Sequence, residues 1–169
     1  MKPSLSTYNP YFKDYIDLVP TENLLEELER TQINTQKLLS LISEEKANFR
    51  YAEGKWSIKE LIVHLTDCER VFQFRTLSFA RNDKTNLPGF EEDDFALHSK
   101  ADNRTLDDIA EEFQSVRKAT ISLFNSFDED DLSKTGMANG GKLNVNACGF
   151  IICGHEIHHV NVLKERYML

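Results

Sequence analysis

Hydrophobic positions along the chain recur in steps of three and four, the period of a helix with one buried face. Between residues 21 and 45 these positions, with two threonines among them, are Leu24, Leu28, Thr31, Thr35, Leu38 and Ile42. Pro20 and Thr21 precede this stripe and are typical of a helix start. The pattern predicts a first long helix over residues 21–45.

Three further helices are predicted by similar stripes and sharper start signals. Ser57 and Glu60 have the spacing of a capping box at the start of a helix that runs to about Arg81. Thr105 precedes a third stripe that ends near Phe127, and Asn144 can cap a fourth helix that ends near Tyr167. The Gly- and Asn-rich residues 135–142 are expected to form a loop, and we see no strand-like alternation. The chain is therefore predicted to be all-α.

Four helices of this length suggest a four-helix bundle. The connection over residues 82–104 could span about 75 Å when extended, whereas a 25-residue helix is only about 37 Å long. The second and third helices can therefore run parallel, joined by a long crossover. Residues 1–20 are expected to form an arm packed on a single domain over residues 21–169.

Composition narrows the possible partners. The chain has 20 Lys and Arg against 28 Asp and Glu, a net charge of −8, which argues against binding to nucleic acid. It has no run of about 18 apolar residues and no apolar N-terminal stretch, so we expect no membrane span or signal peptide and a cytoplasmic location. The three cysteines, Cys68, Cys148 and Cys153, do not suggest a disulfide framework.

The histidines carry the most specific chemical signal. His155 and His159 are four residues apart, so both imidazoles lie on one face of the fourth helix and could grip one metal ion. His64 lies on the apolar face of the second helix, about 10 Å from its start, and the pair lies about 15 Å from the end of theirs. In an antiparallel arrangement the three rings fall at nearly one level. Three imidazoles and an open position are typical of a catalytic metal site, although a buried histidine can also be a hydrogen-bonded core residue.

Three other residues near this constellation are assigned different roles. His158 is rotated away from His155 around the helix, and we expect it at the rim or in packing. Cys68, one turn after His64, could be a ligand but is more typical of packing. His98 has no partner at a useful spacing.

These motifs, taken together, resemble the DinB/YfiT-like superfamily of four-helix metal-binding proteins. The resemblance rests on Trp56-Ser57-Ile58-Lys59-Glu60-Leu61 leading to His64, on Leu87-Pro88-Gly89-Phe90-Glu91, and on Gly154-His155-Glu156-Ile157-His158-His159. It implies an up-down-down-up bundle and a divalent metal held by His64, His155 and His159. It also implies a homodimer, and relatives that are low-molecular-weight-thiol transferases or isomerases, or metal-dependent hydrolases.

We carry three functional hypotheses from this sequence. The first is a metal-dependent transferase of a low-molecular-weight thiol, with zinc or nickel as the metal, because a divalent ion lowers the pKa of a thiol that binds it. The second is a hydrolase that activates water in the same way. The third is a non-enzymatic metal-binding or dimerisation module whose fourth position is filled by a side chain such as Cys68.

Four further residues are candidates for supporting roles in either enzyme. Glu60 and Asp67 could orient a ligand imidazole or act as a base, although Glu60 is also the expected capping residue. Arg75 and Arg166 lie on the histidine-bearing faces and could bind a carboxylate of the thiol, with surface ion pairs as the alternative.

Overall fold

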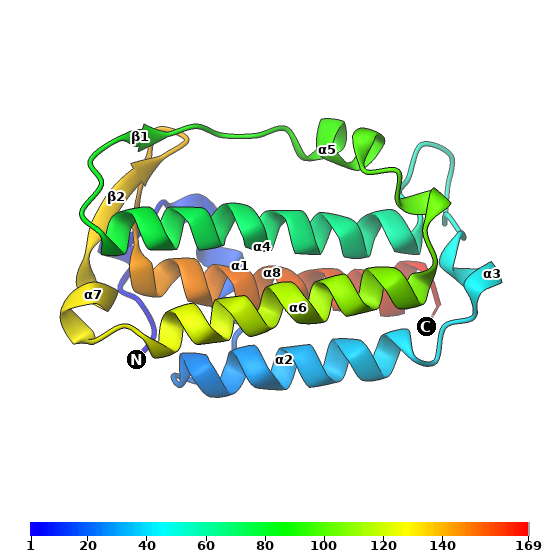
Figure 1. Cartoon of the computed structure of the whole chain (residues 1–169), viewed down its shortest axis with the longest axis horizontal. Helices are drawn as coiled ribbons and strands as arrows, with labels where there is room; N and C mark the ends of the chain where they lie inside the picture. Colours follow the sequence, from blue (N-terminus) through cyan, green and yellow to red (C-terminus); the bar gives the residue numbers. More distant parts are fainter. Residues whose placement is uncertain (169) are drawn as a thin grey trace.

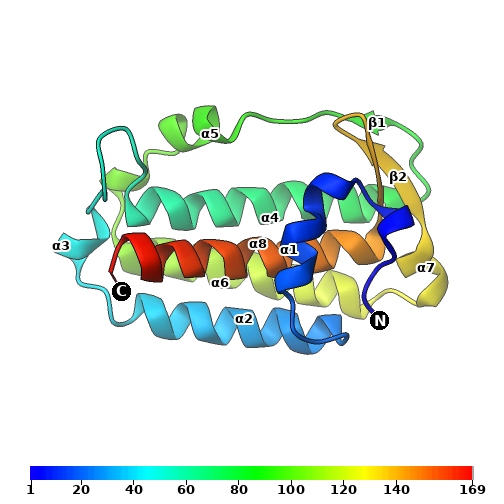
Figure 2. The same ribbon diagram turned by 180° about the vertical axis from the view of Figure 1, so that it is seen from behind.

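The computed structural model describes residues 1–168 and contains four long helices packed as a bundle (Figure 1). These are α2 (Leu24–Leu39), α4 (Ile58–Ala80), α6 (Leu106–Asn125) and α8 (Val145–Arg166). Figures 1 and 2 show that α2 and α8 run in one direction and that α4 and α6 run in the other. The all-α class and the up-down-down-up order are therefore confirmed.

Local capping explains where most of the long helices begin. The Ser57 Oγ accepts the Glu60 N–H (3.1 Å) and a Glu60 carboxylate oxygen accepts the Ser57 N–H (2.8 Å), which completes the predicted capping box. Thr105 and Asn144 cap α6 and α8 as predicted, through side-chain oxygens that accept a backbone N–H. These caps fix the axial positions of the side chains that follow.

The first long helix differs from its prediction at both ends. Its N-cap is Asn23, whose side chain accepts the Glu26 N–H, rather than Pro20 or Thr21. The helix ends at Leu39, and a separate short helix, α3 (Glu44–Ala47), begins after a second cap at Ser43. A residue that can cap a new helix interrupts the hydrophobic stripe, so the predicted continuous helix over residues 21–45 was wrong.

The N-terminal residues lie against the bundle. They form two single 3-10 turns, Leu5–Thr7 and Pro10–Phe12, and the short helix α1 (Lys13–Leu18). Ile16 and Val19 are buried, and α1 crosses α8 (Figure 2). The crossing is close, because a Cβ built on Gly154 of α8 would lie 1.9 Å from the Tyr15 carbonyl oxygen. The absence of a side chain at Gly154 therefore lets α1 reach the histidine-bearing helix.

The connection between α4 and α6 runs along the outside of α4 (Figure 1). It contains the two-residue strand β1 (Asn86–Leu87), the helix α5 (Glu92–His98) and a 3-10 turn (Ala101–Asn103). The crossover spans the length of the parallel helices it joins, as the predicted geometry requires.

The predicted loop over residues 135–142 is instead part of a small sheet. Strands β2 (Thr135–Ala138) and β3 (Gly141–Asn144) pair antiparallel, and β1 pairs parallel to β2. The hairpin turns at Asn139 and Gly140, which both have positive φ (50° and 70°), as the commonest two-residue hairpin turn requires. A short helix, α7 (Glu129–Ser133), precedes it. The sheet closes one end of the bundle and leaves the fold class unchanged.

Within the described chain, none of the helices is long and apolar enough to cross a membrane. The bundle interior is mostly aliphatic and aromatic, in two clusters of buried side chains. A network of buried charged groups, centred on Arg117 of α6, lies between the four long helices next to the histidines.

Candidate metal centre

Two antiparallel helices bring the three predicted histidines together. His64 lies about two turns after the capped start of α4, and His155 and His159 lie about three and two turns before the end of α8. Because α4 and α8 are packed neighbours that run in opposite directions, these positions fall at the same level. The level is set by the caps at Ser57 and Asn144, which start the two helices.

The Nε2 atoms of the three rings converge on one point. The Nε2 of His155 lies 3.1 Å from that of His64 and 3.0 Å from that of His159. Three imidazoles bound tetrahedrally to zinc at 2.0–2.1 Å would have nitrogens about 3.3 Å apart. All three ligand atoms lie within 4.8 Å of one another, so they are close enough to bind a single divalent ion.

The surroundings keep the three imidazoles neutral. Burial lowers the pKa of His64 to about 4, and burial with neighbouring imidazoles lowers the pKa of His159 to about 3. Burial and the imidazoles of His159, His64 and His158 hold the pKa of His155 well below its usual range. Neutral rings offer the nitrogen lone pairs that bind a metal. Lone pairs held this close repel one another, and a cation bound by all three nitrogens removes this repulsion.

Two further observations bear on the fit of a metal. The Nδ1 of His159 is buried, and no group in the described part of the chain forms a hydrogen bond with it, so these residues do not fix the tautomer of the ring. The Cys68 sulfur lies 3.7 Å from both ring nitrogens of His64 but outside the group of converging ligand atoms. Burial raises the pKa of the Cys68 thiol. Cys68 therefore lies beside the site without completing it.

Aromatic rings hold the histidines from two sides. The Trp56 ring is tilted against His64, with ring centroids 4.6 Å apart. Tyr15 of α1 places its ring edge-on to His155 and to His158, with centroids 5.4 Å apart in each case. The N-terminal segment therefore forms part of the site, and Tyr15 and Trp56 are contacts that sequence reasoning missed.

A cavity of about 410 Å³ opens beside His155. Its walls come from three segments outside the bundle as well as from α4 and α8: the N-terminal segment, the crossover near Gly89 and the hairpin between β2 and β3. His155 and His159 are only partly buried, whereas His64 is 6% exposed. The histidine cluster is thus open to a chamber large enough for a small organic molecule.

A family model described as the DinB superfamily matches residues 27–163, which is most of the chain. The chain belongs to the DinB superfamily. A relative from Oceanobacillus iheyensis, which carries the name "putative metal-dependent hydrolase", is 22% identical over 151 residues that cover 86% of each chain. Among solved structures, YfiT from Bacillus subtilis matches with a TM-score of 0.67 and 15% identity, over 98% of this chain and 93% of YfiT. That structure is described as a probable metal-dependent hydrolase with an unusual four-helix bundle topology.

In this DinB domain the two acidic residues expected to support the histidines point to other partners. Glu60 closes the capping box and pairs with Arg50, and Asp67 pairs with Arg70 at 3.4 Å. Neither carboxylate is hydrogen-bonded to a histidine of the cluster in the described part of the chain. Arg50, in the loop after α3, pairs with Glu60, and Arg70 of α4 pairs with Asp67, so neither carboxylate orients a ligand imidazole in this structure. A role for either group as a base stays a prediction.

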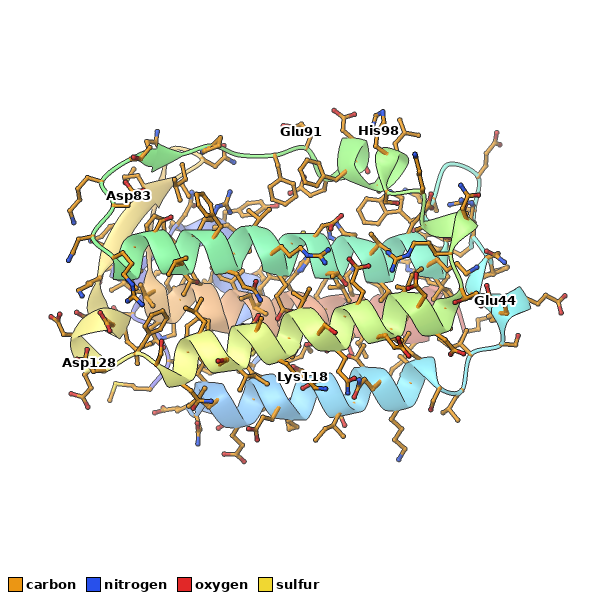
Figure 3. All side chains as sticks on the ribbon, viewed as in Figure 1. Glu44, Asp83, Glu91, His98, Lys118 and Asp128 are labelled. Atoms are coloured by element: carbon orange, nitrogen blue, oxygen red, sulfur yellow. The ribbon has the colours of Figure 1, made fainter. Side chains whose placement is uncertain are left out.

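The remaining predicted residues differ in whether they lie near the histidine cluster and its cavity. Arg166 is exposed in the last turn of α8, away from the cavity wall, whereas Arg75 is buried and lines the cavity. His158 contacts the rings of Tyr15 and His159 and lies outside the converging group. His98 lies on α5 and points away from the bundle (Figure 3), with Nδ1 2.8 Å from the Asp94 carbonyl oxygen.

A buried charged network next to the histidines was not predicted. Arg117 of α6 is fully buried and donates to both carboxylate oxygens of Glu69 on α4, at 2.8 and 2.7 Å. Its Nη1 lies 2.8 Å from Glu156, the residue after His155. Thr35 of α2 donates to the other oxygen of Glu156 (2.5 Å). Threonines within the predicted apolar stripe of α2 were the signal that could have revealed this polar core.

Proposed function

We propose that this DinB protein is a metal-dependent enzyme in which His64, His155 and His159 hold one zinc or nickel ion. The observation that supports it is the convergence of three neutral imidazole nitrogens beside an open cavity. When bound, such an ion lowers the pKa of a thiol or a water molecule that occupies the fourth position. The names of two relatives, both given as metal-dependent hydrolases, agree with a role for a metal.

The first candidate reaction is transfer of a low-molecular-weight thiol to an electrophile. Within residues 1–168, no carboxylate is hydrogen-bonded to the three histidines, and the two carboxylates on the cavity wall, Glu91 and Glu92, are exposed, so none is held against the histidines as a general base. Attack by water gains from such a base, whereas a thiol that has lost its proton to solvent attacks without one.

The second candidate reaction is hydrolysis of an ester or amide. It is favoured by the names of the relatives from Oceanobacillus iheyensis and Bacillus subtilis, both of which describe a metal-dependent hydrolase. Tyr15, whose ring lies against His155, would then be the nearest hydroxyl-bearing side chain along the cavity wall. Burial raises the pKa of Tyr15, so its hydroxyl stays protonated and can donate a hydrogen bond to a substrate oxygen.

A single set of assays separates the two reactions. Thiol consumption with a reactive aryl halide and turnover of ester and amide substrates are measured for protein loaded with zinc or nickel, and again after chelation. We expect metal-dependent thiol consumption that is lost in His155→Ala and kept in His98→Ala, the exposed control. Faster ester or amide turnover would instead select hydrolysis. If metal accelerates neither reaction, the proposal of an enzyme is wrong.

A further inference from the structure

We propose that Arg75 forms a subsite for a carboxylate on the substrate, in the cavity that adjoins the three histidines. The proposal rests on the proposed function only for the identity of the reacting group; the anion site itself is argued from the surroundings of Arg75. Arg75 is 5% exposed, lies on α4 and lines the cavity together with His155.

Among residues 1–168, the guanidinium of Arg75 has no anionic partner. Its Nη2 donates to the Pro88 carbonyl oxygen (3.1 Å), its Nε is buried with no acceptor, and its carbon lies 5.0 Å from the centroid of the Phe72 ring. In the described residues no carboxylate oxygen comes within 4.0 Å of it. A buried charge without a counterion is costly, and proteins usually pair it.

The other buried arginine shows what pairing looks like in this fold. Arg117 meets Glu69 through two parallel hydrogen bonds and lies beside Glu156. Both arginines are held inside the bundle, but Arg75 lines the large cavity beside His155 and, among residues 1–168, has no carboxylate partner, whereas Arg117 does not line that cavity. An external carboxylate would supply the fork-to-fork contact that Glu69 gives to Arg117.

The cavity walls favour an organic anion over an inorganic one. The apolar side chains of the wall include those of Phe12, Phe72, Leu143 and Ile151. Glu91 and Glu92 also border the cavity, but both are exposed to solvent, and Lys142 on the hairpin offsets part of their charge. A carboxylate attached to a hydrocarbon chain suits both the buried cation and these walls.

Helix geometry sets the length of such a ligand. Arg75 follows His64 by eleven residues, close to three full turns, so both lie on one face of α4 about 16 Å apart along the axis. Side chains of both residues lean towards the N-terminus of α4, and the longer Arg75 leans further, with its guanidinium carbon 5.0 Å from the ring centroid of Phe72, which shortens the separation to roughly 13 Å. We infer a substrate whose reactive group and carboxylate are separated by about six or seven bonds.

The test measures binding of hexanoate and hexanamide to metal-free protein by NMR titration. We expect the wild-type protein to bind the acid at least about tenfold more tightly than the amide, the usual advantage of a hydrogen bond to a charged group. Arg75→Gln should reduce this preference to less than about twofold. Arg166→Gln, which removes an exposed arginine at the end of α8, should leave it unchanged.

Two outcomes would overturn the subsite: no preference for the acid in the wild-type protein, or the same preference in Arg75→Gln. Arg75→Lys, which keeps the charge, should retain an intermediate preference, and it serves if Arg75→Gln fails to fold. Because these titrations contain no metal, they do not depend on the metal centre. The same titrations with 6-mercaptohexanoate and its amide on cobalt-loaded protein test whether one ligand binds both the Arg75 subsite and the metal. If binding of the acid depends on Arg75 but is not strengthened by cobalt, the subsite is supported and the proposed function is contradicted.

Discussion

The buried network around Arg117 provides the sharpest prediction about stability. Arg117→Met removes two hydrogen bonds to Glu69 (2.8 and 2.7 Å), two to Leu28 and Thr31 (3.0 and 2.8 Å), and the ion pair with Glu156. Methionine fills a similar volume, so the cavity term is small. Two carboxylates, 3% and 2% exposed, would remain inside the bundle without a cation.

Removing one partner of a buried charged group costs about 3–5 kcal/mol, mainly because the other charge stays buried and unpaired. Domains of this size have a free energy of unfolding of about 5–15 kcal/mol, so the variant is expected to fold but to lose a large share of its stability. Adding Glu69→Gln and Glu156→Gln to Arg117→Met should recover much of the loss, since no unpaired charge is then left.

Urea unfolding followed by circular dichroism gives the free energy of unfolding of each variant. The matched control is Lys118→Met, the same substitution at the next residue of α6, where the side chain is exposed (Figure 3). We expect the control to stay within about 0.5 kcal/mol of wild type. If Arg117→Met is as stable as Lys118→Met, or if the triple variant is no more stable than Arg117→Met alone, the reasoning about the network is refuted.

Two further predictions concern the arm and the pH dependence. Gly154→Ala places a Cβ 1.9 Å from the Tyr15 carbonyl oxygen, so α1 must shift, and the free energy of unfolding should fall by about 1–3 kcal/mol. We expect faster proteolysis of the N-terminal segment in this variant. Unchanged proteolysis would show that the segment does not depend on this contact. In metal-free protein, unfolded imidazoles take up protons near pH 6.5, whereas folded His64 and His159 do so only near 4 and 3. Stability should therefore fall by about 2 kcal/mol per imidazole between pH 6.5 and 5, measured by urea unfolding in a chelator, and an equal fall in His64→Gln would contradict this cause.

The features predicted correctly from sequence are those that short stretches determine. The helix periods and the caps at Ser57, Thr105 and Asn144 are local, and they place His64 level with His155 and His159 once α4 and α8 are antiparallel. The histidine cluster could therefore be predicted from helix geometry alone.

The features that were missed depend on contacts between distant segments. Asn139-Gly140 is a strong hairpin signal, but its flanking strands are short, and Gly136 is needed because a side chain there would meet the ring of Phe79. An arginine such as Arg117 is expected on the surface of a helix when only the sequence is known. It is a core residue because Glu69 and Glu156, from two other helices, pair with it. The cavity wall likewise combines the N-terminal segment, the crossover and the hairpin, whose meeting is a property of the folded chain.

The most direct test of the metal centre is the metal content of protein purified without a histidine tag. The variants are His64→Ala, His155→Ala and His159→Ala, with the exposed His98→Ala as the matched control. After loading with zinc or nickel and dialysis, we predict one equivalent per chain in wild type and in the control, and less than a tenth of that in the other three. Equal metal content in all five proteins would contradict a site formed by these histidines.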